Sequence, residues 1–340
     1  MKLLIKTAPY MQYLMEPAAY IKRLKELLQK VSTRLDVDAV LLSGGLDSSV
    51  TTYILKDRDP ICLTITFEDY GKDVQYATIL TKQLKLRHII INVNTRYAID
   101  KIPIVIKILR TFSPMEIPND IPLVIAFEYL KSIGCKNVAT GDGGDELFCG
   151  YSYMLRMDTK ELEEYLNKLP KFWYFPSIEI GKHYNIKVVS IFLQEEIVDF
   201  ALKIPVIYKV HTSPDGRKIG KYILRLAFEK ELPHCIVWRS KDPIEVGSGF
   251  TKLREYINGL ISDSEFEEER KRIYEEDKVI ITNKEQLFYY KIFRKFFDKP
   301  CNYSRSNLRC PYCGSDLNPY NTKYCYMCGS YISSSGGYIK

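Results

Sequence analysis

A string of glycine, serine and aspartate at residues 43–49 is the first part of the sequence whose residue types could do chemistry. It lies between an apolar run at 39–42 and a helix expected over 47–56, and the free N–H groups of a helix N-terminus bind phosphate. Glycines let the backbone approach phosphate oxygens, and an aspartate can hold the accompanying Mg²⁺. The alternative is a helix-capping turn, and the Gly-Lys-Ser/Thr ending of a Walker A loop is missing. The predicted phosphate-binding residues are Ser43, Gly44, Gly45, Leu46, Asp47, Ser48 and Ser49.

A second glycine-and-acid string, at residues 140–151, again follows a short strand and enters a helix. Acids beside a phosphate would repel it unless Mg²⁺ lies between them, so we predict that Asp145 and Asp47 hold one Mg²⁺ ion. Asp142 is predicted to act on the reacting nucleophile. The alternatives are a Ca²⁺ site, which the missing EF-hand spacing disfavours, and a simple acidic turn.

Two Cys-x-x-Cys pairs near the C-terminus predict a metal site. Each pair is followed by glycine, which allows the tight turn that presents two thiolates to one ion. So small a unit cannot build a core unaided, and we expect structural Zn²⁺ to supply the folding free energy. Two disulfides are the alternative, while a redox site is disfavoured because no thioredoxin-like unit surrounds the pairs. The expected zinc ligands are Cys310, Cys313, Cys325 and Cys328.

The predicted zinc ribbon is rich in aromatic residues whose role the sequence leaves open. They could stack on RNA bases, pack on the ribbon itself or bind a protein. The residues concerned are Tyr312, Tyr320, Tyr324 and Tyr326, together with Lys323.

The elements that must position the two glycine-and-acid strings alternate between strand and helix. This alternation predicts crossover connections and an α/β fold with a doubly wound parallel sheet. The continuous apolar run at 88–93 indicates a strand covered on both faces. The expected strands are 39–42, 61–67, 88–93 and 137–140, and the expected helices are 20–34, 47–56, 73–86 and 122–133.

From residue 158 onward the pattern is mainly helical. The helical stretches are 161–169, 195–203, 218–231 and 284–297, and a charge run at 265–271 is typical of a solvated helix face. We therefore expect one large domain over 1–297, with its sheet part at about 36–150 and its helical part at about 151–297. A linker at 298–309, the zinc ribbon at 310–332 and a frayed tail at 333–340 are expected to follow.

The 340-residue chain carries a net charge of +7, which fits a protein that handles polyanions such as ATP and equally fits ordinary solubility. No segment reaches the roughly 18 apolar residues of a transmembrane helix, and residues 1–10 lack the apolar core of a signal peptide. We therefore expect a cytoplasmic protein with reduced cysteines and no membrane partner.

The first string, Ser-Gly-Gly-Leu-Asp-Ser-Ser, resembles the pyrophosphate loop of the ATP-pyrophosphatases in the form used by asparagine synthetases. The second, Thr-Gly-Asp-Gly-Gly-Asp-Glu-Leu-Phe-Cys-Gly-Tyr, resembles the second signature of the same family. The resemblance implies an adenine nucleotide alpha hydrolase-like fold that uses ATP and Mg²⁺. It also implies nucleotide contacts from Leu41, Ile65, Thr140 and Gly141, in addition to the first string.

The same resemblance implies three catalytic residues. Asp142 takes the place of the acid that assists ammonia attack, where many asparagine synthetases have glutamate. Lys241 corresponds to the lysine that stabilises negative charge during adenylation, which a fixed ammonium beside the α-phosphate would do. Lys221 and Arg225 also match the family. Taken without the surrounding match, each lysine would be interpreted as a solvated surface charge.

Two departures from the family concern the substrates. At the family's Arg-x-Pro-Phe-Leu-Asp string, Val189 and Gln194 replace the arginine and the aspartate. The change removes a bidentate carboxylate binder and predicts a substrate other than aspartate. We also expect no glutaminase domain ahead of the first string, so that nitrogen would come from free ammonia, a separate glutaminase subunit or an amine.

Three functions are compatible with these residues. The favoured one is an ATP-dependent ligase that adenylates a small-molecule carboxylate, releases pyrophosphate and forms an amide with ammonia or an amine. The first alternative is a tRNA-modifying enzyme that adenylates a nucleobase, which the ribbon and the positive charge favour mildly. The second is a non-catalytic ATP-binding protein, which the intact Asp47, Asp145 and Lys241 disfavour.

Overall fold

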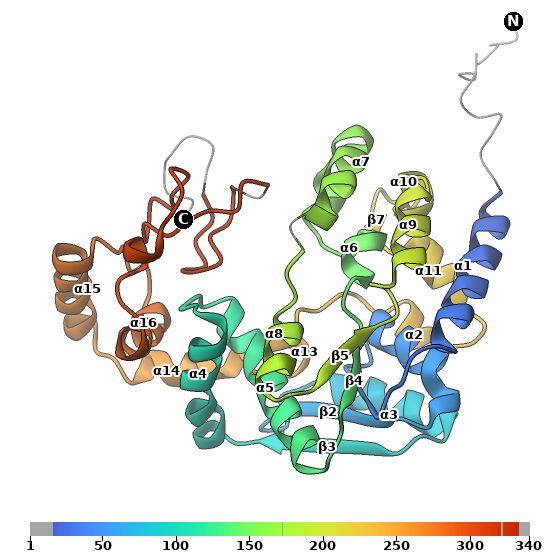
Figure 1. The fold of residues 1–340 in the computed structure, drawn as a ribbon, viewed down its shortest axis with the longest axis horizontal. Coiled ribbons are helices and arrows are strands. Elements are labelled where there is room, and N and C mark those ends of the chain that lie inside the picture. The colour runs from blue at the N-terminus through green and yellow to red at the C-terminus, as the bar shows by residue number, and fades with distance from the viewer. Residues whose placement is uncertain (1–15, 172, 321, 333–340) are drawn as a thin grey trace, which may run out of the picture.

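The computed structural model describes residues 16–171, 173–320 and 322–332. Its centre is a five-stranded sheet in the order β3-β2-β1-β4-β5, in which all neighbouring strands are parallel (Figure 1). The strands are β1 (Ala39–Leu41), β2 (Ile61–Phe67), β3 (His88–Val93), β4 (Asn137–Thr140) and β5 (Lys187–Ser190). The predicted doubly wound parallel sheet is confirmed, and β5 is a strand that the sequence did not predict.

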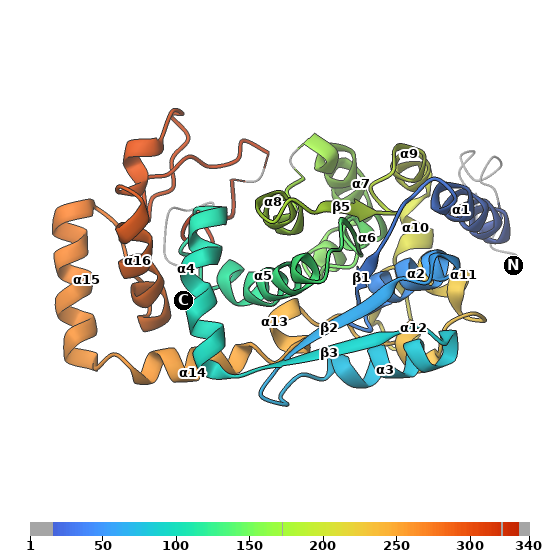
Figure 2. The same cartoon turned by 60° about the horizontal axis from the view of Figure 1, so that its bottom comes forward.

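Helices cover both faces of the sheet because successive strand residues point to opposite sides. Ala39 and Leu63 face one apolar core, whereas Val40 and Cys62 face the other. Figure 2 shows α5 and α3 on opposite sides of β2 and β3. The first core is built from α4 (Thr95–Leu109), α5 (Glu116–Ser132), α8 (Pro176–His183), α14 (Thr251–Gly259) and α16 (Lys284–Phe296). The second is built from α1 (Pro17–Ser32), α2 (Leu46–Leu55), α3 (Asp73–Leu84), α9 (Glu195–Lys203) and α11 (Tyr222–Phe228).

Shorter elements complete the part of the chain after β4. The solvated helix predicted from the charge run is α15 (Asp263–Asp277), in which Ile273 is the buried residue. The remaining elements are α6 (Gly144–Phe148), α7 (Thr159–Lys168), α10 (Val206–Lys209), α12 (His234–Val237), α13 (Ile244–Gly247) and a two-stranded antiparallel sheet of β6 (His211–Thr212) and β7 (Lys218–Ile219).

Two predictions about elements are wrong. Strand β3 is at the edge of the sheet, and Ile90 is 45% exposed, so the strand is not covered on both faces. The helix predicted over 218–231 is shorter, because Lys218 and Ile219 form β7 and Lys221 adopts a left-handed backbone with φ of 57°. Helix α11 begins only after that residue.

The C-terminal cysteine-rich segment packs against the helices of the first core (Figure 1). The backbone N–H of Phe112 donates to the Met327 carbonyl at 2.8 Å, and the Gln286 side chain donates to the Cys328 carbonyl at 2.7 Å. The predicted linker at 298–309 contains a short 3₁₀ turn, Pro300–Tyr303. The expected tail at 333–340 and residues 1–10 lie outside the described residues.

None of the helices in the described ranges has the length and apolar character needed to cross a lipid bilayer.

The ring of Phe112, in the segment that hydrogen-bonds to the ribbon, allows a test of packing in the helical core. This ring is fully buried edge-on against Tyr290 at 4.8 Å, so Phe112→Ala should lower the free energy of unfolding by about 3–5 kcal/mol. Urea denaturation would measure the loss. Phe296→Ala is the control, since this ring on α16 is 43% exposed and its removal should cost much less. Equal losses in the two variants would contradict the packing described.

Candidate active site

Both glycine-and-acid strings lie at the carboxyl ends of two adjacent strands, β1 and β4. From β1 the chain continues to β2 and β3 on one side of the sheet, whereas from β4 it continues to β5 on the other. Open parallel sheets bind ligands at such a switch point, outside the carboxyl ends of the strands. The topology therefore brings together two strings that are far apart in sequence.

The first string forms a tight loop that leads into α2. Gly44 has φ of +68°, and a Cβ there would clash with Tyr76 and Ala77 of α3, so only glycine fits. The Ser43 and Ser48 hydroxyls are 3.1 Å apart, and the Ser49 hydroxyl is buried with no hydrogen-bond partner. The loop thus presents hydroxyls beside the free N–H groups of a helix N-terminus, as a phosphate site requires.

The second string touches the first directly. A Cβ on Gly141 would come within 2.9 Å of the Ser48 nitrogen, and one on Gly144 would overlap the Asp47 carboxylate. Glycine at these two positions therefore lets the second loop rest against the first turn of α2.

A single ammonium group joins the two predicted metal-binding acids. The Lys221 Nζ lies 2.5 Å from Asp47 Oδ2 and 2.6 Å from Asp145 Oδ1. The Lys241 Nζ lies 2.9 Å from the other oxygen of Asp145. The side chains of Asp47, Asp145, Lys221 and Lys241 thus meet in one charge cluster, which does not include Asp142.

Burial and neighbouring charge set the ionisation of this cluster. Burial raises the pKa of Asp47 to about 6. Burial alone would also raise the pKa of Asp145, but the ammonium groups of Lys221 and Lys241 hold it below its usual value. Conversely, burial alone would lower the pKa of Lys241, and the carboxylates of Asp145 and Asp47 raise it. Lys241 therefore stays charged, and Asp145 stays ionised.

Asp142 is held by hydroxyl groups and not by lysine. Its Oδ2 accepts hydrogen bonds from Thr140 Oγ1 at 2.7 Å and from Ser177 Oγ of α8. The Ser190 hydroxyl at the end of β5 donates to the backbone carbonyl of Asp142 at 2.6 Å. Burial raises the pKa of Asp142, which brings the group closer to the range of a general acid or base. The sequence did not predict Ser177 or Ser190, because no motif connects either residue with Asp142.

A family model for asparagine synthase matches residues 23–179 and 188–312. The chain belongs to the asparagine synthase family. Among its relatives, the probable glutamine-hydrolyzing asparagine synthetase of Dictyostelium discoideum is 29% identical over 79% of this chain and 54% of its own length. The glutamine-hydrolyzing asparagine synthetase B of Escherichia coli K12 is 29% identical over 77% of this chain and 50% of its own length. The chain thus spans about half the length of the curated relatives it matches.

Among solved structures, one match is the NH3-dependent NAD synthetase from Campylobacter jejuni, at 15% identity and a TM-score of 0.30 over 71% of this chain and 93% of that chain. A score of this size supports no argument about this asparagine synthase family member.

Other residues that match the asparagine synthase family stabilise the backbone or lie within strands of the sheet. Arg225 donates from Nε to the Gly220 carbonyl at 3.0 Å and from Nη1 to the Val237 carbonyl, so it braces the backbone around Lys221. Ile65 is buried within β2, and Leu41 is partly buried at the end of β1, both on the side of the first core. Their predicted contacts with the nucleotide remain predictions.

Arg239 is a site residue to which the sequence assigned no role. Its Nη1 donates to the Ser43 carbonyl at 3.1 Å, and its Nη2 pairs with Asp73 at 2.6 Å. The guanidinium also lies over the Tyr76 ring at 4.2 Å. Arg239 therefore fixes the first loop to the start of α3, and its place two residues before Lys241 was the one sequence signal that could have identified it.

The positions that depart from the family are not in contact with the charge cluster. Val189 is a buried residue of β5 in the second core, and Gln194 caps the start of α9 and donates to the Ser190 carbonyl at 2.8 Å. Neither supplies a positive charge for a substrate carboxylate.

The four cysteines predicted to bind metal form one cluster, with their sulfur atoms all within 4.8 Å of one another. The Cys310–Cys328 and Cys313–Cys325 sulfur pairs are each 3.7 Å apart, well beyond the roughly 2.05 Å of a disulfide, and all nine cysteines are free. The disulfide alternative is therefore wrong for this structure. The cluster has the spacing of a four-thiolate metal site.

The ribbon tyrosines proposed for RNA contact are largely engaged with the protein. Tyr324 OH donates to Glu116 Oε1 at 2.7 Å, and the Tyr326 ring lies edge-on to Tyr174 at 4.7 Å. The Tyr312 carbonyl accepts a hydrogen bond from the Ile280 N–H at 2.7 Å. Tyr324 and Tyr326 thus contact the preceding part of the chain, whereas Tyr320 is 53% exposed.

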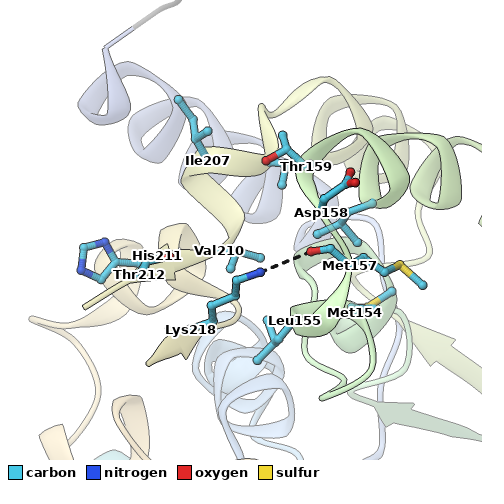
Figure 3. Close-up of a pocket in the computed structure, with 12 residues that line it drawn as sticks. Met154, Leu155, Met157, Asp158, Thr159, Ile207, Val210, His211, Thr212 and Lys218 are labelled. Atoms are coloured by element: carbon cyan, nitrogen blue, oxygen red, sulfur yellow. Dashed lines mark hydrogen bonds between the residues drawn. The ribbon is translucent and has the colours of Figure 1, made fainter. Parts of the chain in front are cut away.

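A cavity of about 500 Å³ lies apart from the charge cluster, between the segment that leads into α7 and the α10–β7 segment (Figure 3). Its lining is mainly apolar and includes Met154, Leu162 and Val206. The Lys218 ammonium at its edge donates to the Met157 carbonyl at 3.3 Å. No residue predicted for catalysis or nucleotide binding lines it.

Glu116, near the ribbon, predicts a pH dependence of stability. Burial raises the pKa of Glu116 from 4.5 to about 7. The stability that the bound proton contributes is fully present below pH 4.5 and is lost as the pH rises through 7. Glu116→Gln keeps an acceptor for Tyr324 and should unfold with a free energy higher than the wild type's by about 1–3 kcal/mol at about pH 8. The difference should vanish in acid. Urea denaturation across this pH range is the test, with exposed Glu255→Gln as control; a pH-independent difference would contradict it.

Proposed function

We propose that the chain is an ATP-dependent ligase that adenylates a carboxylate, releases pyrophosphate and forms an amide with ammonia or an amine. The observation that carries the proposal is the charge cluster at the switch point of the sheet, in which Asp47, Asp145 and Lys221 are buried and the Lys241 side chain is 39% exposed. Membership of the asparagine synthase family supports it.

The first loop would hold the pyrophosphate end of ATP. The α2 N-terminus and the Ser43, Ser48 and Ser49 hydroxyls supply donors for its oxygens, and Arg239 keeps the loop in place. Leu41, Ile65, Thr140 and Gly141 would border the rest of the nucleotide.

Asp47 and Asp145 fit a magnesium site. Asp47 Oδ1 is buried without a hydrogen-bond partner, and the pair supplies the carboxylate oxygens that Mg²⁺ prefers. Bound Mg²⁺ would neutralise the pyrophosphate and ease its departure. In the structure the Lys221 ammonium lies between the same two carboxylates and offsets their charge there.

The lysines would act in the adenylation step. A substrate carboxylate oxygen attacks the α-phosphorus, the P–O bond to pyrophosphate breaks, and negative charge grows on the α-phosphate oxygens. The fixed ammonium groups of Lys241 and Lys221 are placed to stabilise that charge. Asp142 would then accept a proton from the attacking nitrogen as AMP leaves.

The chemistry can be tested by exchange of labelled pyrophosphate into ATP, screened over candidate carboxylic acids. Lys241→Met should reduce exchange about 10²–10³-fold, since it removes one donor to the transition state. Asp47→Asn should abolish it. Lys252→Met is the control, because this exposed lysine of α14 forms an ion pair with Glu255 on the same helix. If tRNA supports exchange and no acid does, the ligase proposal is wrong.

We also propose that the four-cysteine cluster holds structural Zn²⁺. The two knuckles are alike: the Gly314 N–H donates to the Cys310 carbonyl at 2.9 Å, and the Gly329 N–H donates to the Cys325 carbonyl at 2.8 Å. Sulfur separations of 3.7 Å fit four thiolates around one ion with Zn–S bonds of about 2.3 Å.

Metal analysis of the purified protein should find one equivalent of zinc. Cys313→Ser should lose the zinc and lower the melting temperature, because the metal supplies folding free energy to the ribbon. Cys235→Ser, which alters an exposed cysteine outside the cluster, should retain the full equivalent. Retention of zinc in Cys313→Ser would rule out the assignment.

A further inference from the structure

A second group of acids lies near Asp142, on α5 and α13. Helix α5 places Glu116 and Asp120 one turn apart on the same face, and α13, which packs against α5, contributes Glu245. The carboxyl groups of Glu116, Asp142 and Glu245 are near enough to Asp120 to raise its pKa well above the usual value, after burial, which is the larger cause. Four acids thus converge beside the proposed reaction centre.

The carboxylate of Asp120 is buried without compensation. The residue is 1% exposed, and its Oδ2 has no hydrogen-bond partner. The Glu245 Oε2 is also buried and without a partner. A buried polar atom without a partner costs roughly 1–3 kcal/mol, and more when charged, so such atoms are expected where a ligand supplies the missing partner.

Nearby cations are already used elsewhere. Lys241 pairs with Asp145 at 2.9 Å, and Arg254 pairs with Glu285 at 2.6 Å. Within the described ranges of the chain, no ion pair includes Glu116, Asp120, Asp142 or Glu245. The four acids therefore form no ion pair of their own, although Lys241 and Arg254 are near enough to oppose the rise that burial causes in the pKa of Glu245.

The spacing of the acids favours an organic cation over a metal ion. Among the described residues, the four cysteines alone bring three or more ligand atoms close enough together to hold a metal. A protonated amine has several N–H donors and can bridge carboxylates that are farther apart.

We propose that Asp120, Glu116 and Glu245 bind the protonated amino group of a substrate and hold it beside Asp142. The inference deepens the proposed ligase function, since it names a charge that one substrate must carry. Tyr326 of the ribbon borders the site, because its hydroxyl is buried and lies near Asp120 and Glu116. The C-terminal ribbon therefore contributes to substrate binding.

Binding of a simple amine tests the site without any turnover. The zinc-loaded full-length protein would be titrated with 1,4-diaminobutane, L-lysine or ammonium chloride at constant ionic strength, with the melting temperature as readout. At least one amine should stabilise the wild type, and Asp120→Asn should weaken its binding about tenfold or more. Asp263→Asn is the control, since this acid lies on the exposed start of α15 and should leave binding unchanged.

Glu245→Gln is a second variant in case Asp120→Asn does not fold. If no amine stabilises the wild type, or if both variants bind amines as the wild type does, the proposal is wrong. It is equally wrong if Mg²⁺ or Ca²⁺, and not an amine, stabilises the protein in a manner that depends on Asp120.

Two activity measurements then locate the charge. Loss of ATP–pyrophosphate exchange in Asp120→Asn would place the amino group on the acid that is adenylated. Retained exchange with loss of amide formation would place it on the nitrogen nucleophile, and either result supports the site. If amine binding depends on Asp120 but no acid supports exchange in the wild type, the cation site stands and the ligase proposal fails.

Discussion

Two buried carboxylates from distant parts of the chain both stay ionised side by side only when positive charge offsets their repulsion, and this constraint governs the site. Asp47 follows β1 and Asp145 follows β4, and the Lys221 ammonium bridges them. The bridge in turn fixes Lys221, whose left-handed backbone is held by a hydrogen bond of 2.7 Å from its N–H to the Phe148 carbonyl. A non-glycine residue adopts this conformation at some energetic cost, which the surrounding contacts offset. The course of the chain between β7 and α11 thus follows from the need to neutralise two acids.

The two acid groups of the site differ in electrostatic character. Around Asp47 and Asp145, the ammonium groups of Lys221 and Lys241 equal the carboxylates in number, so phosphate oxygens would not meet an unpaired negative charge. Among the described residues Asp120 has no cation within ion-pair distance, and its Oδ2 has no hydrogen-bond partner, which suits a region that receives a cation. Asp142 is close to both groups and accepts hydrogen bonds from two neutral hydroxyls. A molecule bridging the two regions would be negative at one end and positive at the other.

The nucleotide half of the site could be predicted from sequence because each requirement there is local. A glycine turn between strand and helix is recognisable as a string, and so are the paired cysteines, which the structure brings within one cluster. The rest depends on packing between distant elements. Ser177 reaches Asp142 from α8, and Asp73 reaches Arg239 from α3, and no spacing rule connects these residues. Strand β5 also escaped prediction, because it lies in the part of the sequence after residue 158 whose pattern is mainly helical.

The attachment of the ribbon has a consequence for how this architecture could change over time. Two hydrogen bonds to ribbon carbonyls join the ribbon to the α4–α5 connection: the Thr111 hydroxyl donates to the Tyr326 carbonyl at 2.8 Å, and the Phe112 N–H donates to the Met327 carbonyl. Removal of the ribbon would strand these donors and uncover apolar rings of α16. The ribbon is therefore not an independent unit that could be removed without disturbing the helices. If a lineage gained or lost the ribbon, helices α4, α5 and α16 would have to change with it. The residues of those helices should therefore differ between relatives with the ribbon and relatives without it.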